Sequence, residues 1–172
     1  MGVQQTIVPN LWFDDQAEEA ARFYVEVFSN RTGASDPAKS EIVTVTHYPQ
    51  DGPGGKKAGD VLTVEFQIEG QRFTGINGGP EFTFTEAVSF LITCETQEEI
   101  DELWDRLVEG GGEHGPCGWL KDRYGLSWQV APTGMEEMLN GPDKEGAKRS
   151  FAAMMQMQKI DKAELERAYE GA

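Results

Sequence analysis

Several kinds of residue are scarce in this chain, and each scarcity excludes a class of protein. Two cysteines among 172 residues are too few for a disulfide scaffold, a zinc ribbon or a Cys-x-x-Cys redox pair. Lys and Arg number 15 against 30 Asp and Glu, so the net charge of −15 repels nucleic acid and anionic membranes. No run approaches the roughly 18 apolar residues that cross a bilayer. We therefore expect neither a nucleic-acid partner nor a membrane partner.

The start of the chain, Met1 to Gln5, lacks the positive charge and the apolar core of a secretory signal. We therefore expect a cytoplasmic protein in which Cys94 and Cys117 are free thiols. A chain of this length buries about two thirds of its unfolded surface, which suffices for one compact domain or two small fused modules.

The first half predicts the order strand, helix, strand, strand, strand. Residues 6–13 form an apolar run, and Asp14 with Asp15 marks the start of a helix whose apolar residues reach Phe28. Glu69–Gly70 is a tight hairpin between the last two of three strand-like segments, which are 41–47, 61–68 and 71–77. Residues 48–60 carry two prolines and four glycines, so we predict an irregular loop there, long enough to be mobile over a site.

The second half repeats this order after Gly78-Gly79-Pro80. Residues 87–94 form a strand, and Thr96 with Glu99 makes a capping box that opens a helix with a buried stripe ending at Val108. Short strands follow at 118–121 and 126–131, with a weaker candidate at 113–117.

The last 32 residues lie outside both modules. Asp143 caps a helix that bears Ala147, Phe151, Met154, Met155 and Gln158. Asp161 with Glu164 makes a second capping box, which opens a short helix with Leu165 and Ala168 or Tyr169 facing inward. We therefore predict a domain over 1–140, made of two βαβββ modules at about 4–78 and 86–132, and a C-terminal helical extension over 141–172.

A doubled βαβββ plan predicts an α+β fold with two curved mixed sheets. Each sheet is too short to close, so it curls and leaves a concave face free for a ligand, while its helix covers the convex face. We expect the two modules to form curved sheets around a cavity, with the C-terminal helices added.

Five short motifs carry a family resemblance that spans about residues 6–139. They are Pro9-Asn10-Leu11-Trp12-Phe13-Asp14, Ala17-Glu18-Glu19-Ala20 with Phe23-Tyr24, Asn77-Gly78-Gly79-Pro80, Glu86-Ala87-Val88-Ser89-Phe90 and Cys117-Gly118-Trp119-Leu120-Lys121-Asp122. On these residues the chain resembles the vicinal oxygen chelate (glyoxalase and bleomycin-resistance) superfamily. It resembles more closely the PhnB-like branch that carries the name 3-demethylubiquinone-9 3-methyltransferase. The superfamily hosts isomerases, dioxygenases, thiol transferases and pure binders, so the resemblance implies the fold more than the reaction.

The resemblance also implies where a metal would sit. Metal-dependent relatives place His, Glu and sometimes Gln ligands on the first and fourth strands of each module. In this chain those positions are occupied by Val8, Thr74 or a neighbour, Ser89 and Gln129. Three of the four cannot supply a strong ligand, so we predict no metal site and no cofactor.

The chain has only two histidines. His47 ends a predicted strand, and His114 lies three residues before Cys117. His114 and Cys117 are half of a zinc site or a thiol–imidazole pair in one interpretation. In the other, which we favour, they are an exposed loop histidine and a cysteine at a strand edge.

Strand alternation selects the candidate ligand-binding residues. On the last strand, one face carries Ser127, Gln129 and Ala131. On the fifth strand, one face carries Ser89, Leu91 and Thr93. On the seventh strand, Trp119 and Lys121 share a face. Asn10 and Trp12 share a face of the first strand, and we add Asn77 from its motif. We therefore predict a ligand site of amides, hydroxyls and indoles: Asn10, Trp12, Asn77, Ser89, Trp119 and Gln129. The alternative is that the tryptophans belong to the core and the amides bond the backbone.

Two functional interpretations follow. In the first, the chain is a binding module, or an enzyme working without metal, that holds a small ring-bearing or carbonyl-bearing organic molecule and pairs as a homodimer, as relatives do. In the second, it is a metal-dependent lyase or isomerase of glyoxalase type, or a dioxygenase. A methyltransferase is the weakest reading, because no glycine-rich turn follows the first strand, where the chain reads Asp14-Asp15-Gln16. We assign no catalytic residue.

Overall fold

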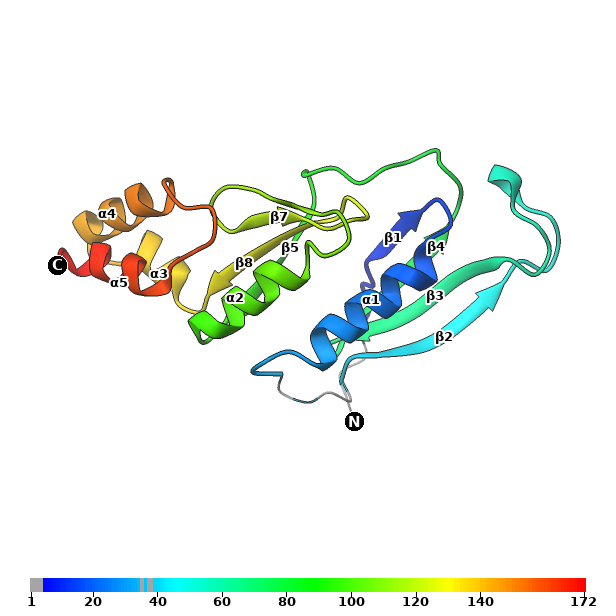
Figure 1. Cartoon of the computed structure of the whole chain (residues 1–172), viewed down its shortest axis with the longest axis horizontal. Coiled ribbons are helices and arrows are strands. Elements are labelled where there is room, and N and C mark those ends of the chain that lie inside the picture. Colours follow the sequence, from blue (N-terminus) through cyan, green and yellow to red (C-terminus); the bar gives the residue numbers. More distant parts are fainter. Residues whose placement is uncertain (1–4, 35, 37–38) are drawn as a thin grey trace. The chain divides into compact units, whose positions relative to one another are not determined.

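Alternating side chains build two four-stranded mixed sheets, each covered on one face by a helix (Figure 1). The computed structural model describes residues 5–34, 36 and 39–172, so the predicted start of the first module near residue 4 lies outside the described residues. The chain divides into two compact units, residues 1–84 and residues 85–172. The α+β class and the two four-stranded sheets with C-terminal helices confirm the predicted fold class.

The first unit has the sheet order β1-β4-β3-β2 and, among its described residues, one α-helix. Its elements are β1 (Asn10–Phe13), α1 (Ala17–Ser29), β2 (Glu41–His47), β3 (Val61–Ile68) and β4 (Gln71–Asn77). β1 pairs with β4 in parallel, and the other pairs are antiparallel. The hairpin at Glu69–Gly70 is confirmed, and both of its residues have positive φ angles, as a tight two-residue turn requires.

Aromatic packing joins α1 to this sheet. Tyr24 of α1 is fully buried and stacks on Phe66 of β3, with ring centroids 6.1 Å apart, and Phe66 stacks on Phe73 of β4 at 5.4 Å. An added Cβ on Gly75 would lie 3.1 Å from the Cβ of Ala17, so this glycine permits the helix to start close to β4. Among the described residues of this unit, no helix packs on the opposite face of the sheet.

The start of α1 differs from the prediction. Asp14 and Asp15 precede the helix, but it begins at Ala17, and Gln16 at its N-cap makes no side-chain cap bond. The free Ala17 N–H instead donates to Asn77 Oδ1 at 2.8 Å. The predicted cap was wrong because the acceptor that satisfies this helix comes from β4, 60 residues along the chain.

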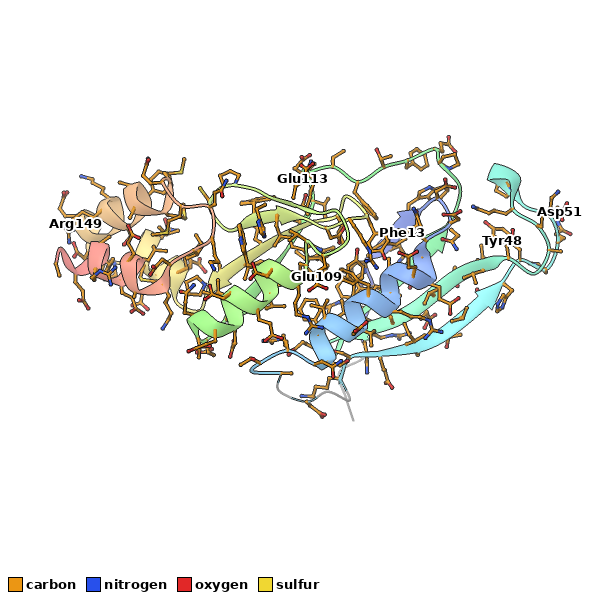
Figure 2. All side chains as sticks on the ribbon, viewed as in Figure 1. Phe13, Tyr48, Asp51, Glu109, Glu113 and Arg149 are labelled. Atoms are coloured by element: carbon orange, nitrogen blue, oxygen red, sulfur yellow. The ribbon has the colours of Figure 1, made fainter. Side chains whose placement is uncertain are left out.

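The loop at residues 48–60 is fastened to the end of the first sheet. It contains one short 3₁₀ turn, Pro53–Gly55, where we predicted no regular structure. Tyr48 Oη donates to Asn77 O at 2.8 Å, and Gly54, at φ +66°, packs its backbone against Gly79. Figure 2 shows Phe13 beside α1, and Tyr48 with Asp51 in the loop that follows β2.

The second unit holds sheet order β5-β8-β7-β6 and four helices. Its strands are β5 (Ser89–Cys94), β6 (Glu113–His114), β7 (Trp119–Lys121) and β8 (Ser127–Pro132). Helix α2 (Gln97–Arg106) covers the face that carries Trp128 and Val130. Thr96 caps α2 as predicted, by accepting from Glu99 N, but Glu99 Oε2 accepts from Glu95 N rather than completing the box at Thr96.

The C-terminal extension packs within the second unit. It comprises α4 (Lys144–Met154) and α5 (Lys162–Glu170), and α3 (Met135–Asn140) precedes it. Asp143 and Asp161 cap α4 and α5 as predicted. Leu165 of α5 is buried, as predicted, whereas Phe151 and Met155 are exposed. The small residues Gly146, Ala147 and Ser150 face inward instead, because α4 lies too close to α5 for larger side chains there. Within the described part of the chain, no helix is long and apolar enough to cross a bilayer.

Candidate functional site

The uncovered face of the first sheet holds Asn10 and Trp12. The Asn10 side chain is exposed, and its Nδ2 donates to Val8 O at 2.9 Å. The Trp12 indole lies over Gly78, donates from Nε1 to Gly79 O at 2.9 Å, and meets the ring of Phe82 edge-on at 5.0 Å. Trp12 is therefore a fixed, partly exposed aromatic surface.

Asn77 lies on the other, helix-covered face. It pairs in register with the buried Phe13, its Oδ1 caps α1, and its Nδ2 donates to Val61 O at 3.2 Å. The structure therefore does not bring Asn77 to the face that carries Asn10 and Trp12. The Asn77 amide instead stabilises the start of α1 and bonds the backbone of β3.

The uncovered face of the second sheet brings the other three predicted residues together. Gln129 Nε2 donates to Ser89 Oγ at 2.8 Å, and Trp119 stands opposite Gln129 in the β7–β8 register. Residues that are opposite each other in register point to the same face of a sheet. The alternation therefore placed Ser89, Trp119 and Gln129 correctly on one face.

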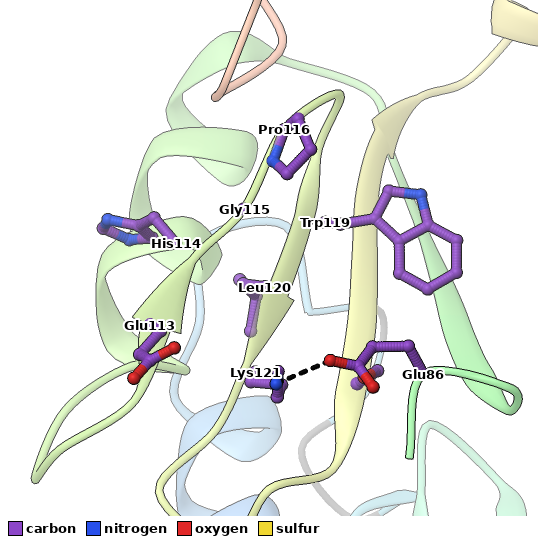
Figure 3. Close-up of a pocket in the computed structure, with 9 residues that line it drawn as sticks. Glu86, Glu113, His114, Gly115, Pro116, Trp119, Leu120 and Lys121 are labelled. Atoms are coloured by element: carbon purple, nitrogen blue, oxygen red, sulfur yellow. Dashed lines mark ion pairs between the residues drawn. The ribbon is translucent and has the colours of Figure 1, made fainter.

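A pocket of about 360 Å³ lies at the β6–β7 side of this sheet (Figure 3). It is lined by Glu86, Glu113, His114, Gly115, Pro116, Trp119, Leu120, Lys121 and Ser127. Of the six predicted site residues, only Trp119 lines it. Strand alternation in the sequence placed Lys121 on the same face as Trp119, and Ser127 on the same face as Gln129. Alternation could therefore have identified Lys121 and Ser127 as lining residues. Glu86 and Glu113 carried no comparable signal.

Charge in this pocket is mainly acidic. Lys121 Nζ lies 2.6 Å from Glu86 Oε1, and the two side chains point toward one another in Figure 3. The hydrogen bond from Lys121 lowers the pKa of the Glu86 carboxyl below its ordinary value. The hydrogen bond to Glu86 raises the pKa of the Lys121 ammonium, with a smaller contribution from the charge of Glu113. Both partners therefore stay ionised at neutral pH, and two carboxylates face one ammonium.

One buried hydroxyl in the pocket is left without a partner. Ser127 is 1 % exposed, and its Oγ makes no hydrogen bond to any of the described residues. Ser89, which lies opposite Ser127 in the β5–β8 register, already accepts a hydrogen bond from Gln129. A buried hydroxyl without a partner costs free energy, so such an atom at a pocket wall is a place where a ligand gains a hydrogen bond.

His114 and Cys117 do not form a pair. The His114 ring stacks on Trp104 at 4.5 Å, and its Nε2 lies 2.9 Å from Trp104 O, which accepts from it. Cys117 Sγ instead contacts Met155 Sδ at 3.9 Å. Over the described residues, no three His, Cys, Asp or Glu side chains gather as a metal site would require.

The positions that hold a metal in the resembling enzymes carry unsuitable donors here. Ser89 and Gln129 are neutral and satisfy each other, Thr74 is a hydroxyl, and Val8 has no side-chain donor. Imidazole and carboxylate are the strong ligands for a divalent cation at such positions. Only Gln129 is of a type that metal-dependent relatives use there, and its amide is hydrogen-bonded to Ser89, so these four residues do not fit a metal.

Comparison with known proteins identifies the fold and the family. The model of a family described as 3-demethylubiquinone-9 3-methyltransferase matches residues 5–131. A PhnB protein from Bacillus cereus with the same methyltransferase description is 37% identical, with 75% of this chain and 100% of that chain covered and a TM-score of 0.60. No curated protein sequence is similar enough to count as a match.

Two more distant structures share the fold alone. A protein from Pseudomonas aeruginosa is 17% identical, covers 75% of this chain and 98% of its own, and has a TM-score of 0.57. The fosfomycin resistance protein FosX from Listeria monocytogenes is 16% identical, covers 79% of this chain and 98% of its own, and has a TM-score of 0.51. The family model and the 37% identical PhnB protein show that the chain belongs to the PhnB-like family described as 3-demethylubiquinone-9 3-methyltransferase.

Proposed function

We propose that this chain binds a small, uncharged, ring-bearing organic molecule in the pocket of its second unit, and that it does so without a metal. The observation that carries the proposal is the Ser127 hydroxyl, which is buried at the pocket wall and unpartnered among the described residues. A carbonyl or hydroxyl oxygen on a ligand supplies the missing partner.

The other lining residues define the rest of the ligand. Trp119 offers a flat indole on which a ring can stack, and the volume of about 360 Å³ suits a single-ring molecule. Glu86 and Glu113 repel an anionic ligand, since Lys121 is already paired with Glu86. The family name does not assign a reaction, and Asp14-Asp15-Gln16 after β1 provides no glycine-rich turn for a nucleotide-type methyl donor.

Titration with benzamide, followed by amide chemical shifts, tests this proposal. We expect saturable shifts at residues 113–121 and 127, with a dissociation constant of about 1 mM, because benzamide combines one ring with a neutral carbonyl. Benzoate, which differs by its charge, binds at least about tenfold more weakly. Trp119→Ala weakens benzamide about tenfold, and Phe151→Ala, an exposed aromatic outside the pocket, leaves it unchanged.

Two results would contradict the proposal. The first is a set of benzamide shifts confined to residues outside the pocket. The second is one tightly held divalent ion per purified chain that is lost on Gln129→Ala, which would favour the metal-dependent lyase or isomerase instead.

We also propose that the chain pairs as a homodimer through the free edge of its second sheet. β5 is one of the two edge strands of this sheet. Leu91, on the face of β5 away from α2, is 57 % exposed, and Val88, just before β5, is 62 % exposed. Apolar side chains on a free edge favour pairing with another strand or surface. We expect light scattering to give twice the 19.0 kDa chain mass, and Leu91→Lys to shift it toward one chain. A monomeric mass at about 0.1 mM wild-type protein would refute the proposal.

A further inference from the structure

The C-terminal extension lies beyond the part of the chain that the family model matches, which ends at residue 131. Its helices enclose a small core of Met157, Ile160 and Leu165, with flanking methionines from α3 and α4. Between α4 and α5 the chain returns to the turn that precedes β7. We call residues 157–160 the strap.

The strap is hydrogen-bonded to the turn that joins β6 to β7. Met157 O accepts from Cys117 N at 2.8 Å, and Gln158 O accepts from Gly118 N at 2.7 Å. Ile160 covers the same turn, since its Cγ1 lies 3.0 Å from where a Cβ on Gly118 would be. The backbone N–H groups of Cys117 and Gly118 therefore donate to the extension and not to the β6–β7 hairpin itself.

The turn holds an unfavourable backbone conformation. Cys117 has a φ of +56° and Gly118 a φ of +81°. Glycine adopts this left-handed region freely, but a cysteine with a Cβ does not. The two hydrogen bonds from the strap offset this strain, so the conformation of the turn depends on the strap.

The strap is in turn anchored to α2. Gln97 Nε2 donates to Ile160 O at 3.0 Å, and Gln97 Oε1 accepts from Lys162 N at 2.9 Å. Lys159 Nζ lies 2.8 Å from Asp101 Oδ1. Gln97 and the Lys159–Asp101 ion pair thus fix the C-terminal end of the strap to α2.

The turn forms one end of the pocket. Gly115 and Pro116 before it and Trp119 after it are lining residues, and Trp119 N donates to Pro116 O at 3.0 Å. A change at Cys117 or Gly118 therefore moves Pro116 and the Trp119 indole together.

We infer that the strap, which lies outside the matched family domain and is held to α2 through Gln97 and Lys159, positions the pocket wall and so tunes the affinity of the pocket for ligand. This inference rests on the proposed ligand site. If the pocket bound no ligand, the strap would still fix the turn. The experiment below therefore measures the conformation of the turn and ligand binding separately.

The test compares Gln97→Ala/Lys159→Ala with Lys148→Ala, which removes an exposed ion pair elsewhere in the extension. In the double variant we expect amide exchange at Cys117 and Gly118 to rise at least about tenfold. The ¹⁹F resonance of 5-fluorotryptophan at Trp119 shifts or broadens, and benzamide affinity falls about threefold to fivefold. Lys148→Ala changes none of these.

A rescue distinguishes positioning from general loosening. Cys117→Gly added to the double variant lets the turn keep its positive φ without strain, so it recovers at least half of the lost benzamide affinity. Unchanged exchange at the turn, or faster exchange with an unmoved Trp119 resonance, overturns the inference. If benzamide fails to bind the wild-type protein, the proposed function fails, while exchange and the Trp119 resonance still decide the role of the strap.

Discussion

Replacement of Asp122 by Ala lowers the free energy of unfolding by about 3–5 kcal/mol, as measured by urea denaturation. Asp122 is 3 % exposed, and both oxygens of its carboxylate accept hydrogen bonds. Its Oδ1 accepts from Tyr124 N at 2.9 Å and Leu126 N at 3.0 Å, and its Oδ2 accepts from Trp128 Nε1 at 2.9 Å. Without the carboxylate, these donors are left in a buried setting without partners.

Two companion variants define this effect. Asp122→Asn keeps one oxygen but turns an NH₂ group toward the Trp128 N–H, so we expect a loss of about 2–3 kcal/mol. Asp105→Ala, an exposed carboxylate on α2, changes stability by less than about 0.5 kcal/mol. If all three variants unfolded at the same urea concentration as the wild type, the described network around Asp122 would be wrong.

The second large effect is at Gly78, where alanine lowers stability by about 2–3 kcal/mol. A Cβ at this position overlaps the six-membered ring of Trp12, so the indole must leave. It then loses its hydrogen bond to Gly79 O and its edge contact with Phe82. Tryptophan fluorescence of the folded variant shifts to longer wavelength as the ring enters water.

A double-mutant cycle with Trp12→Phe checks this explanation. The smaller ring does not reach as far over Gly78, so Gly78→Ala costs at least about 1 kcal/mol less in that background than in the wild type. Strictly additive effects would show that Gly78 is needed for its own backbone and not for the indole.

Local patterns in the sequence predicted the strand faces and several helix starts. Alternation placed Trp119 and Gln129 on one face and Trp128 and Val130 on the other, because side chains in a strand point alternately to the two faces. Asp143 and Asp161 were recognisable as caps because their acceptors lie within three residues of the amides they bind.

The features that sequence reasoning missed depend on contacts between distant segments. The Asn77 amide caps a helix 60 residues earlier, so its motif indicated a ligand residue where the structure has a cap. The pocket brings Glu86, which lies just before β5, to Lys121 of β7, and no sequence spacing predicts that ion pair. The docking of the strap on the Cys117–Gly118 turn is likewise set by tertiary packing, and neither segment carries a pattern for it.

Ligand binding in the pocket is tested most directly at the Ser127 hydroxyl, which has no partner among the described residues. Ser127→Ala removes a buried polar atom that has no partner among the described residues, so the unliganded protein should be as stable as the wild type or more stable by up to about 1 kcal/mol. The same variant should bind benzamide about fivefold to tenfold more weakly. A variant that is clearly less stable than the wild type and yet binds benzamide with unchanged affinity would contradict the account.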